Sequence, residues 1–96
     1  MNNRLESAKN RLMSELENPP HLINKNYLWE KKYTGWRIKD YVIASHKENV
    51  SVGDCKDWFK GLLQENEIGD EYENLYGNSY SKDIERMYDL LTRYNN

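Results

Sequence analysis

The sequence offers one thiol and two imidazoles for nucleophilic or metal chemistry, those of Cys55, His21 and His46. A helix N-terminus lowers the pKa of a thiol, so a Cys55 nucleophile activated by either histidine is one reading. Cys55 also lies at helical spacing from Trp58 and Phe59, which indicates a buried apolar cysteine instead. The histidines are distant in sequence and there is no second cysteine, so the ligand spacing of a zinc site is missing. We therefore expect no catalytic cysteine and no bound metal.

The glycines and carboxylates fit no phosphate-binding or calcium-binding motif. Gly53, Gly61, Gly69 and Gly77 belong to neither G-x-G-x-x-G nor G-x-x-x-x-G-K-[ST]. The acidic run that begins at Glu65 does not follow the D-x-[DN]-x-[DN]-G pattern of a calcium loop. The remaining carboxylates fall on polar helix faces or in loops, where no desolvation would tune a pKa for acid–base catalysis. The sequence favours a protein that is not an enzyme and that uses no cofactor.

An acidic segment with tyrosines, residues 65–76, is the first candidate binding surface. Carboxylates at this density repel one another, and a partner with a basic surface would relieve that repulsion while tyrosines fill its pockets. The alternative is a solvated helix face. The leading hypothesis is a small protein-binding module, in concrete form a phage or mobile-element inhibitor or immunity-type protein that blocks a basic nucleic-acid-binding surface of an enzyme. The residues of this protein interface are Glu65, Glu67, Asp70, Glu71, Tyr72, Glu73 and Tyr76.

A region of interleaved basic and aromatic residues is the second candidate surface. Residues 1–60 contain 11 basic and 8 acidic side chains, whereas residues 61–96 contain 3 and 8. Lysines that neutralise phosphates, beside rings that stack on bases, would bind single-stranded nucleic acid. The overall net charge of -2 and a pI near 5.7 make this the alternative to protein binding. The residues that would bind nucleic acid are Trp29, Lys31, Lys32, Arg37 and Lys39.

The first half of the chain is expected to form one helix and one hairpin. Leu5, Ala8, Leu12 and Leu16 recur at helical spacing and predict an amphipathic helix over residues 1–18, which the prolines after Asn18 end. Residues 27–46 are rich in Trp, Tyr, Val, Ile and Thr and contain a Thr-Gly turn signal at 34–35. This composition predicts an antiparallel β-hairpin or a three-stranded sheet. Its expected core face is Trp36, Ile38, Val42 and Ala44.

The second half is expected to be helical. Ser51 three residues before Asp54 resembles a capping box and begins a helix over residues 52–68. A short helix over 70–76 and a helix over 80–94 follow. The last helix carries a stripe through which a homodimer is also conceivable, formed by Tyr80, Ile84, Met87, Leu91 and Tyr94.

These elements predict an α+β fold in which two to three C-terminal helices pack on one face of a small sheet. A chain of 96 residues fits one small domain, residues 1–96. The single cysteine and the lack of an apolar leader or of a long apolar run lead us to expect a cytoplasmic protein.

Overall fold

The structure is a computed structural model and describes residues 3–17, 31–66 and 69–94. Every regular element in these ranges is an α-helix, and no strand occurs in them, so the fold of the described chain is all-α. The elements in chain order are α1 (Arg4–Glu17), α2 (Lys31–Lys47), α3 (Val52–Glu65), α4 (Gly69–Tyr76) and α5 (Tyr80–Tyr94).

The expected hairpin, and with it the α+β fold class, is wrong, because residues 31–47 form helix α2. The buried residues of α2 include Ile38, Tyr41, Val42 and Ser45, which follow the helical spacing of three and four rather than the alternation of a strand. Trp36, expected on the core face, is 54% exposed, whereas Tyr41, which that expected face did not include, is 1% exposed. Residues 27–30 of the expected hairpin lie outside the described residues.

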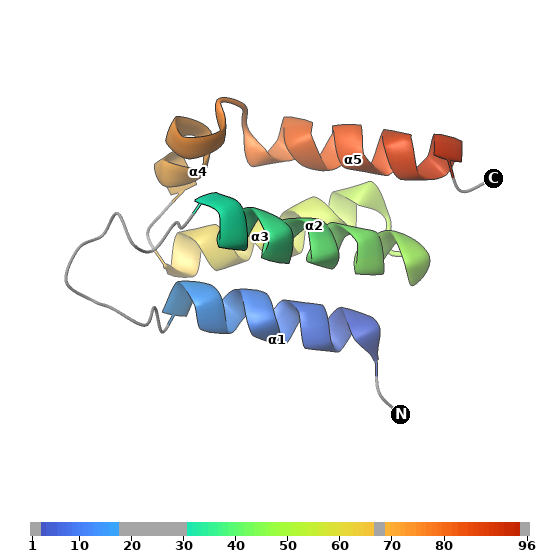
Figure 1. The fold of residues 1–96 in the computed structure, drawn as a ribbon, viewed down its shortest axis with the longest axis horizontal. Helices are drawn as coiled ribbons and strands as arrows, with labels where there is room; N and C mark the ends of the chain where they lie inside the picture. Colours follow the sequence, from blue (N-terminus) through green and yellow to red (C-terminus); the bar gives the residue numbers. More distant parts are fainter. Residues whose placement is uncertain (1–2, 18–30, 67–68, 95–96) are drawn as a thin grey trace.

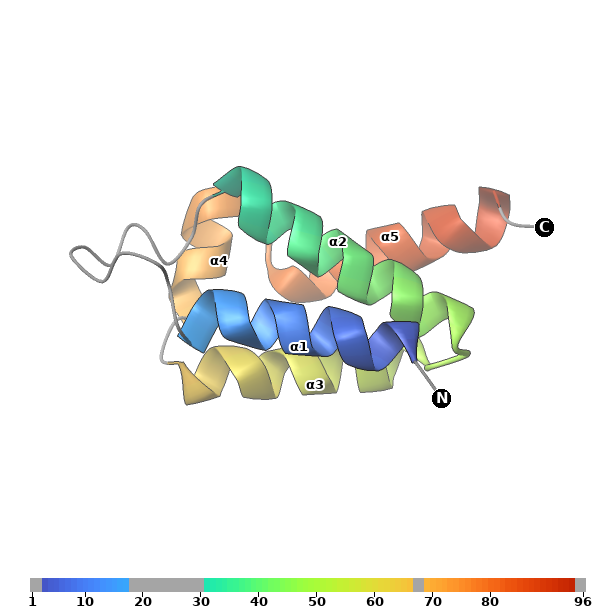
Figure 2. The ribbon, with the colours of Figure 1, turned by 60° about the horizontal axis from the view of Figure 1, so that its bottom comes forward.

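The helices form three layers. Helices α2 and α3 occupy the middle, α1 covers them from one side and α5 from the other (Figure 1). The turned view shows α1 lying along both middle helices with α5 behind them (Figure 2). The core between these layers consists of Leu5, Ala8, Leu12, Leu16, Ile38, Tyr41, Val42, Ala44, Cys55, Phe59, Leu62, Leu63, Tyr72 and Ile84.

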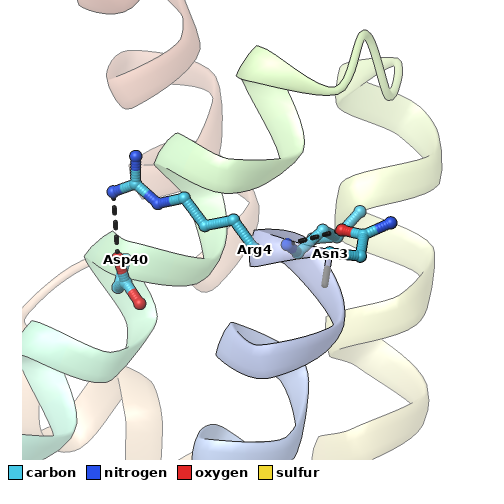
Figure 3. A network of polar contacts seen from close by, with 4 residues as sticks. Asn3, Arg4 and Asp40 are labelled. Carbon is cyan, nitrogen blue, oxygen red and sulfur yellow. Dashed lines mark hydrogen bonds and ion pairs between the residues drawn. The ribbon is translucent and has the colours of Figure 1, made fainter. Parts of the chain in front are cut away.

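Helix α1 is fixed at its start by polar contacts. The side-chain oxygen of Asn3 accepts hydrogen bonds from the backbone amides of Leu5 at 2.8 Å and Glu6 at 3.3 Å, which caps the helix. The Arg4 guanidinium reaches Asp40 of α2 at 3.2 Å (Figure 3). Both side chains are partly exposed, so this ion pair adds at most about 1 kcal/mol. The apolar stripe of α1 therefore supplies most of its binding to the middle layer.

The connection between α2 and α3 is a tight helix ending followed by a cap. Asn49 has a φ of 62°, its amide donates to the His46 carbonyl at 3.2 Å, and the Val50 amide donates to the Ser45 carbonyl at 3.0 Å. These two bonds define a Schellman motif with Asn49 in the left-handed position. Ser51 then accepts from the Asp54 amide at 3.1 Å and begins α3. The short connection holds the two middle helices side by side.

An aromatic cluster and a hydrogen bond hold helix α4 against the start of α5. The Tyr72 hydroxyl donates to the Asp83 carboxylate at 2.6 Å, and its ring meets Phe59 edge-on at 5.9 Å. Gly77, with a φ of 84°, ends α4 in a conformation that favours glycine. None of the helices in the described ranges is long and apolar enough to cross a membrane.

Candidate docking groove between helices α2 and α5

Two adjoining depressions run between α2 and α5, and we call them together the α2–α5 groove. Lys39 and Met87 line both depressions, which makes the groove continuous. The end near α4 has a volume of about 230 Å³ and the other end about 180 Å³. The α4 end is also lined by Gly35, Ile38, Tyr72, Tyr76, Asp83 and Arg86, and the other end by Ile43, Leu90 and Leu91.

The apolar floor of the groove exists because α5 carries more apolar residues than the middle layer covers. Ile84 is buried, whereas Met87 and Leu91 are only half-buried against the core. Leu90 is 43% exposed and Tyr94 is 81% exposed on the same helix. Apolar side chains therefore continue from the groove onto the open surface of α5. Exposed apolar patches on proteins are often interaction sites, so this surface is the candidate site.

The two walls of the groove carry one cation each. Lys39 comes from α2 and Arg86 from α5, and both are exposed. Neither forms an ion pair with a residue that the structure describes. Asp83, the one carboxylate among the described residues that line the groove, already accepts a hydrogen bond from Tyr72. The rim is therefore net positive around an apolar floor.

The α4 end of the groove is closed by two neutral tyrosines. Burial raises the pKa of Tyr76 to about 12. Burial, together with the hydrogen bond to Asp83, raises the pKa of Tyr72 well above its ordinary value. The two rings pack against each other at 4.7 Å. Tyr76 also lies against Gly35, where an added Cβ would meet the Tyr76 hydroxyl oxygen at 3.6 Å. The lack of a side chain on Gly35 thus leaves room at this end.

A further depression, about 520 Å³ between the α2–α3 connection and α5, is shallow and holds groups that already have partners. His46 Nε2 lies 3.1 Å from Thr92 Oγ1, and the Tyr88 hydroxyl donates to the Val50 carbonyl at 2.8 Å. Glu85 pairs with Lys56 of α3, and Asp89 with Arg93. Within the described ranges, no group of three or more His, Cys, Asp or Glu residues is placed to hold a metal ion. The contacts of His46, Tyr88 and Glu85 tie α5 to the rest of the fold, whereas the Asp89–Arg93 pair lies within α5.

Cys55 lies inside the core. Its side chain is fully buried, and the Tyr41 hydroxyl donates to its backbone carbonyl at 2.8 Å. Burial is the main cause that raises the pKa of Tyr41 above its ordinary value, so this hydroxyl keeps its proton and its hydrogen bond. A substrate has no access to the thiol in this arrangement.

The described residues of the expected acidic interface differ in their exposure. Glu65 and Glu73 are exposed, whereas Tyr72 belongs to the core and is not available to a partner. Tyr76 lines the α2–α5 groove. Asp70 and Glu71 lie on α4 without a described side-chain position, and Glu67 lies outside the described residues.

Four of the residues expected to bind nucleic acid lie on helix α2 and not on a sheet. Lys39 is exposed on the groove wall, and Arg37 is half-buried and does not line the groove. Lys31 and Lys32 lie in the first turn of α2 without a described side-chain position, and Trp29 lies outside the described residues.

Sequence reasoning missed three groove residues, Ile43, Arg86 and Leu90. Ile43 was hidden by the strand pattern assigned to residues 27–46. Leu90 was left out because it falls between the members of the expected α5 stripe. One signal was present: apolar residues at 84, 87, 88, 90, 91 and 94 cover more of the helix circumference than a single partner helix buries.

A scan against protein-family models, a search of curated proteins and a search of solved structures found no match to this chain.

Proposed function

We propose that this protein is a small protein-binding module without catalytic activity, and that a partner protein docks on the α2–α5 groove. The observation that carries the proposal is the apolar floor of the groove, which continues onto the exposed Leu90 and Tyr94. When a partner covers large aromatic and aliphatic side chains that are exposed to water, the burial contributes most of the binding free energy. The Lys39 and Arg86 rim would orient that partner.

A second contact surface in this proposal is the exposed part of the acidic segment. Glu65 and Glu73 are exposed near α4. These carboxylates would meet basic groups on the same partner or on another one. The narrower version remains an inhibitor that covers a basic surface of an enzyme.

Nucleic-acid binding is the second candidate function, and one observation favours it. Trp36 is 54% exposed and lies three residues before the exposed Lys39 on α2. A ring and a cation at this spacing on one helix would contact a base and its phosphate. Titration of the tryptophan fluorescence with single-stranded oligonucleotide at about 50 mM and 200 mM salt separates the two functions, because phosphate contacts weaken strongly over that range.

Retention of a partner from lysate of the source cells tests the protein-binding function. Immobilised wild-type protein, the groove variant Leu90→Lys and the control variant Lys60→Glu are compared by quantitative mass spectrometry. Both substitutions change exposed residues, but Lys60 lies on α3 and does not line the groove. We expect at least one protein to be retained by the wild type and the control and lost by Leu90→Lys.

Circular dichroism of the three proteins checks that the variants fold. If they do, a loss of retention reports on the groove. A set of retained proteins that is the same for wild type and Leu90→Lys would refute docking on the groove. Salt-sensitive fluorescence quenching by the oligonucleotide, without any groove-dependent protein partner, would replace protein binding by nucleic-acid binding.

A further inference from the structure

The charge of the groove rim indicates what kind of partner surface fits the groove. Lys39 and Arg86 stand on opposite walls, one on α2 and one on α5. Apolar side chains line both ends of the groove, Ile38 and Met87 at the α4 end with the two cations, and Ile43 and Leu90 at the other end. A ligand that satisfies both features presents apolar side chains to the floor and carboxylates to both edges. Charges at the rim of an interface select the partner and increase the rate of association.

The length and the backbone of the groove indicate the conformation of that ligand. On α2 the groove extends from Gly35 to Ile43, which at 1.5 Å per residue is about 12 Å, or roughly two helical turns. The α2 and α5 backbones satisfy their hydrogen bonds internally, so neither offers an edge to which an extended peptide would add as a strand. Recognition must then occur through side chains alone. An amphipathic helix, with anchors at positions i, i+3 or i+4, and i+7, matches this length.

We infer that the α2–α5 groove binds an acidic amphipathic helix of a partner protein, with two or three apolar residues on the floor and carboxylates paired with Lys39 and Arg86. This inference rests on the proposed protein-binding function and specifies the partner. Tyr76 and Gly35 lie at one end of the groove that this helix would occupy, and Leu90 lies at the other end.

A second copy of this chain fits the groove less well than an acidic helix does. A twofold dimer would pair the same surface on both subunits. The interface would then contain Lys39 and Arg86 from both copies around an apolar floor, and this excess of positive charge disfavours the contact. An acidic ligand faces no such repulsion.

The test uses a display library of random 12-residue peptides, selected on the full-length protein. We expect enriched peptides to carry apolar residues at i, i+3 or i+4, and i+7, with Asp or Glu between them. The groove variant Lys39→Glu with Arg86→Glu should bind the best peptide at least about tenfold more weakly, a loss typical of charged interface contacts. The matched control, Arg11→Glu with Lys60→Glu, changes the net charge equally on exposed residues outside the groove and should bind normally.

A charge exchange makes the test specific for the two rim cations. A copy of the best peptide with its carboxylates replaced by lysines should lose binding to the wild-type protein. The same copy should recover about tenfold or more in affinity on the variant Lys39→Glu with Arg86→Glu. Recovery of this kind would not arise if the double substitution merely damaged the fold.

The inference fails if no peptide is enriched, or if the enriched peptides lack acidic residues or helical spacing. It also fails if the groove variant and the control bind the peptide equally, or if a thymidine oligonucleotide displaces the peptide. Self-association of the wild-type protein in sedimentation, abolished by Leu90→Lys, would assign the groove to a second copy instead. A partner retained from lysate in a groove-dependent manner, together with any of these failures, would leave the protein-binding function in place and reject only the acidic helix.

Discussion

The two outer helices, α1 and α5, cover the middle layer from opposite sides, and they differ in how much of their apolar surface the molecule buries (Figure 1). All four apolar stripe residues of α1 are buried, including Leu12 at 0% exposure. On α5 only Ile84 reaches the same burial, while Leu90 and Tyr94 remain exposed. Helix α1 thus has an apolar face as wide as its contact with α2 and α3, and α5 has a wider one.

This difference separates the surface that stabilises the fold from the surface that the proposed partner would cover. Apolar area contributes to folding only when the folded chain removes it from water. The stripe of α1 meets that condition, whereas the outer part of the α5 stripe does not. The exposed part of α5 is therefore dispensable for the fold and available for binding.

Truncation of one leucine in each outer helix should show the largest contrast. We expect Leu12→Ala to reduce the free energy of unfolding by about 2–5 kcal/mol, because it leaves a cavity in the core. Leu90→Ala should change it by no more than about 0.5 kcal/mol, because the side chain is 43% exposed. Urea unfolding followed by circular dichroism measures both values. Equal losses for the two variants would abolish the distinction between α1 and α5.

Alkaline pH should destabilise the tyrosine-rich core that the outer helices enclose. Burial raises the pKa of Tyr41 and Tyr72 above their ordinary value of 10.0 in the folded state. The stabilisation linked to these raised values is therefore fully present below pH 10. It decreases as the pH rises further, because the unfolded chain then releases protons that the folded chain retains. The decrease is about 1.4 kcal/mol per pH unit for each tyrosine.

Urea midpoints at pH 8, 10 and 11 measure this decrease, and two variants assign it. Tyr41→Phe and Tyr72→Phe should each make the pH dependence shallower, since each removes one group that titrates differently in the two states. At neutral pH, Tyr41→Phe should also cost about 1 kcal/mol for the hydrogen bond to the Cys55 carbonyl. A pH dependence that is the same in both variants and the wild type would contradict the role assigned to these hydroxyls.

Two glycine substitutions should give small effects and should separate helix stability from binding. Gly61 lies inside α3 with no atom within 4 Å of an added Cβ, and at Gly35 in α2 the nearest contact is an ordinary 3.6 Å. We expect Gly61→Ala and Gly35→Ala each to raise the free energy of unfolding by about 0.5–1 kcal/mol. Only Gly35→Ala fills space in the groove, so it alone should change the affinity for a groove-binding peptide. An effect of Gly61→Ala on peptide affinity would mean that binding does not depend on the groove itself.

The helices other than α2 could be expected from local signals. The apolar spacing of α1, the Ser51 cap of α3 and the glycine after α4 act over a few residues, and these signals lie close to the observed helix ends. Such signals are reliable because capping and periodicity depend mainly on neighbouring residues. The bounds differ slightly: the helix expected over 52–68 ends at Glu65, and the one expected over 1–18 is described as Arg4–Glu17.

Helix α2 could not be expected in the same way, because its local signals favour a strand. Trp36, Ile38, Val42 and Ile43 have side chains of strand-forming types, and Gly35 follows a threonine as in a turn. Burial against α1, α3 and α5 outweighs those weak preferences. The packing stripe through Ile38, Tyr41, Val42 and Ser45 requires helical geometry. The error in this one element concealed the groove, since one of its walls is α2.

Residue types and local spacing by themselves determined that Cys55 belongs to an apolar stripe, where each of the other helices lies and that α5 is amphipathic. Each of these features depends on residues within a few turns of one another. Only the tertiary structure decided that residues 31–47 are helical, that Tyr72 is core, and that Lys39 of α2 and Arg86 of α5 line the same depression. The physical reason is that burial and charge pairing depend on residues from helices distant in sequence, and these meet only when the chain has folded.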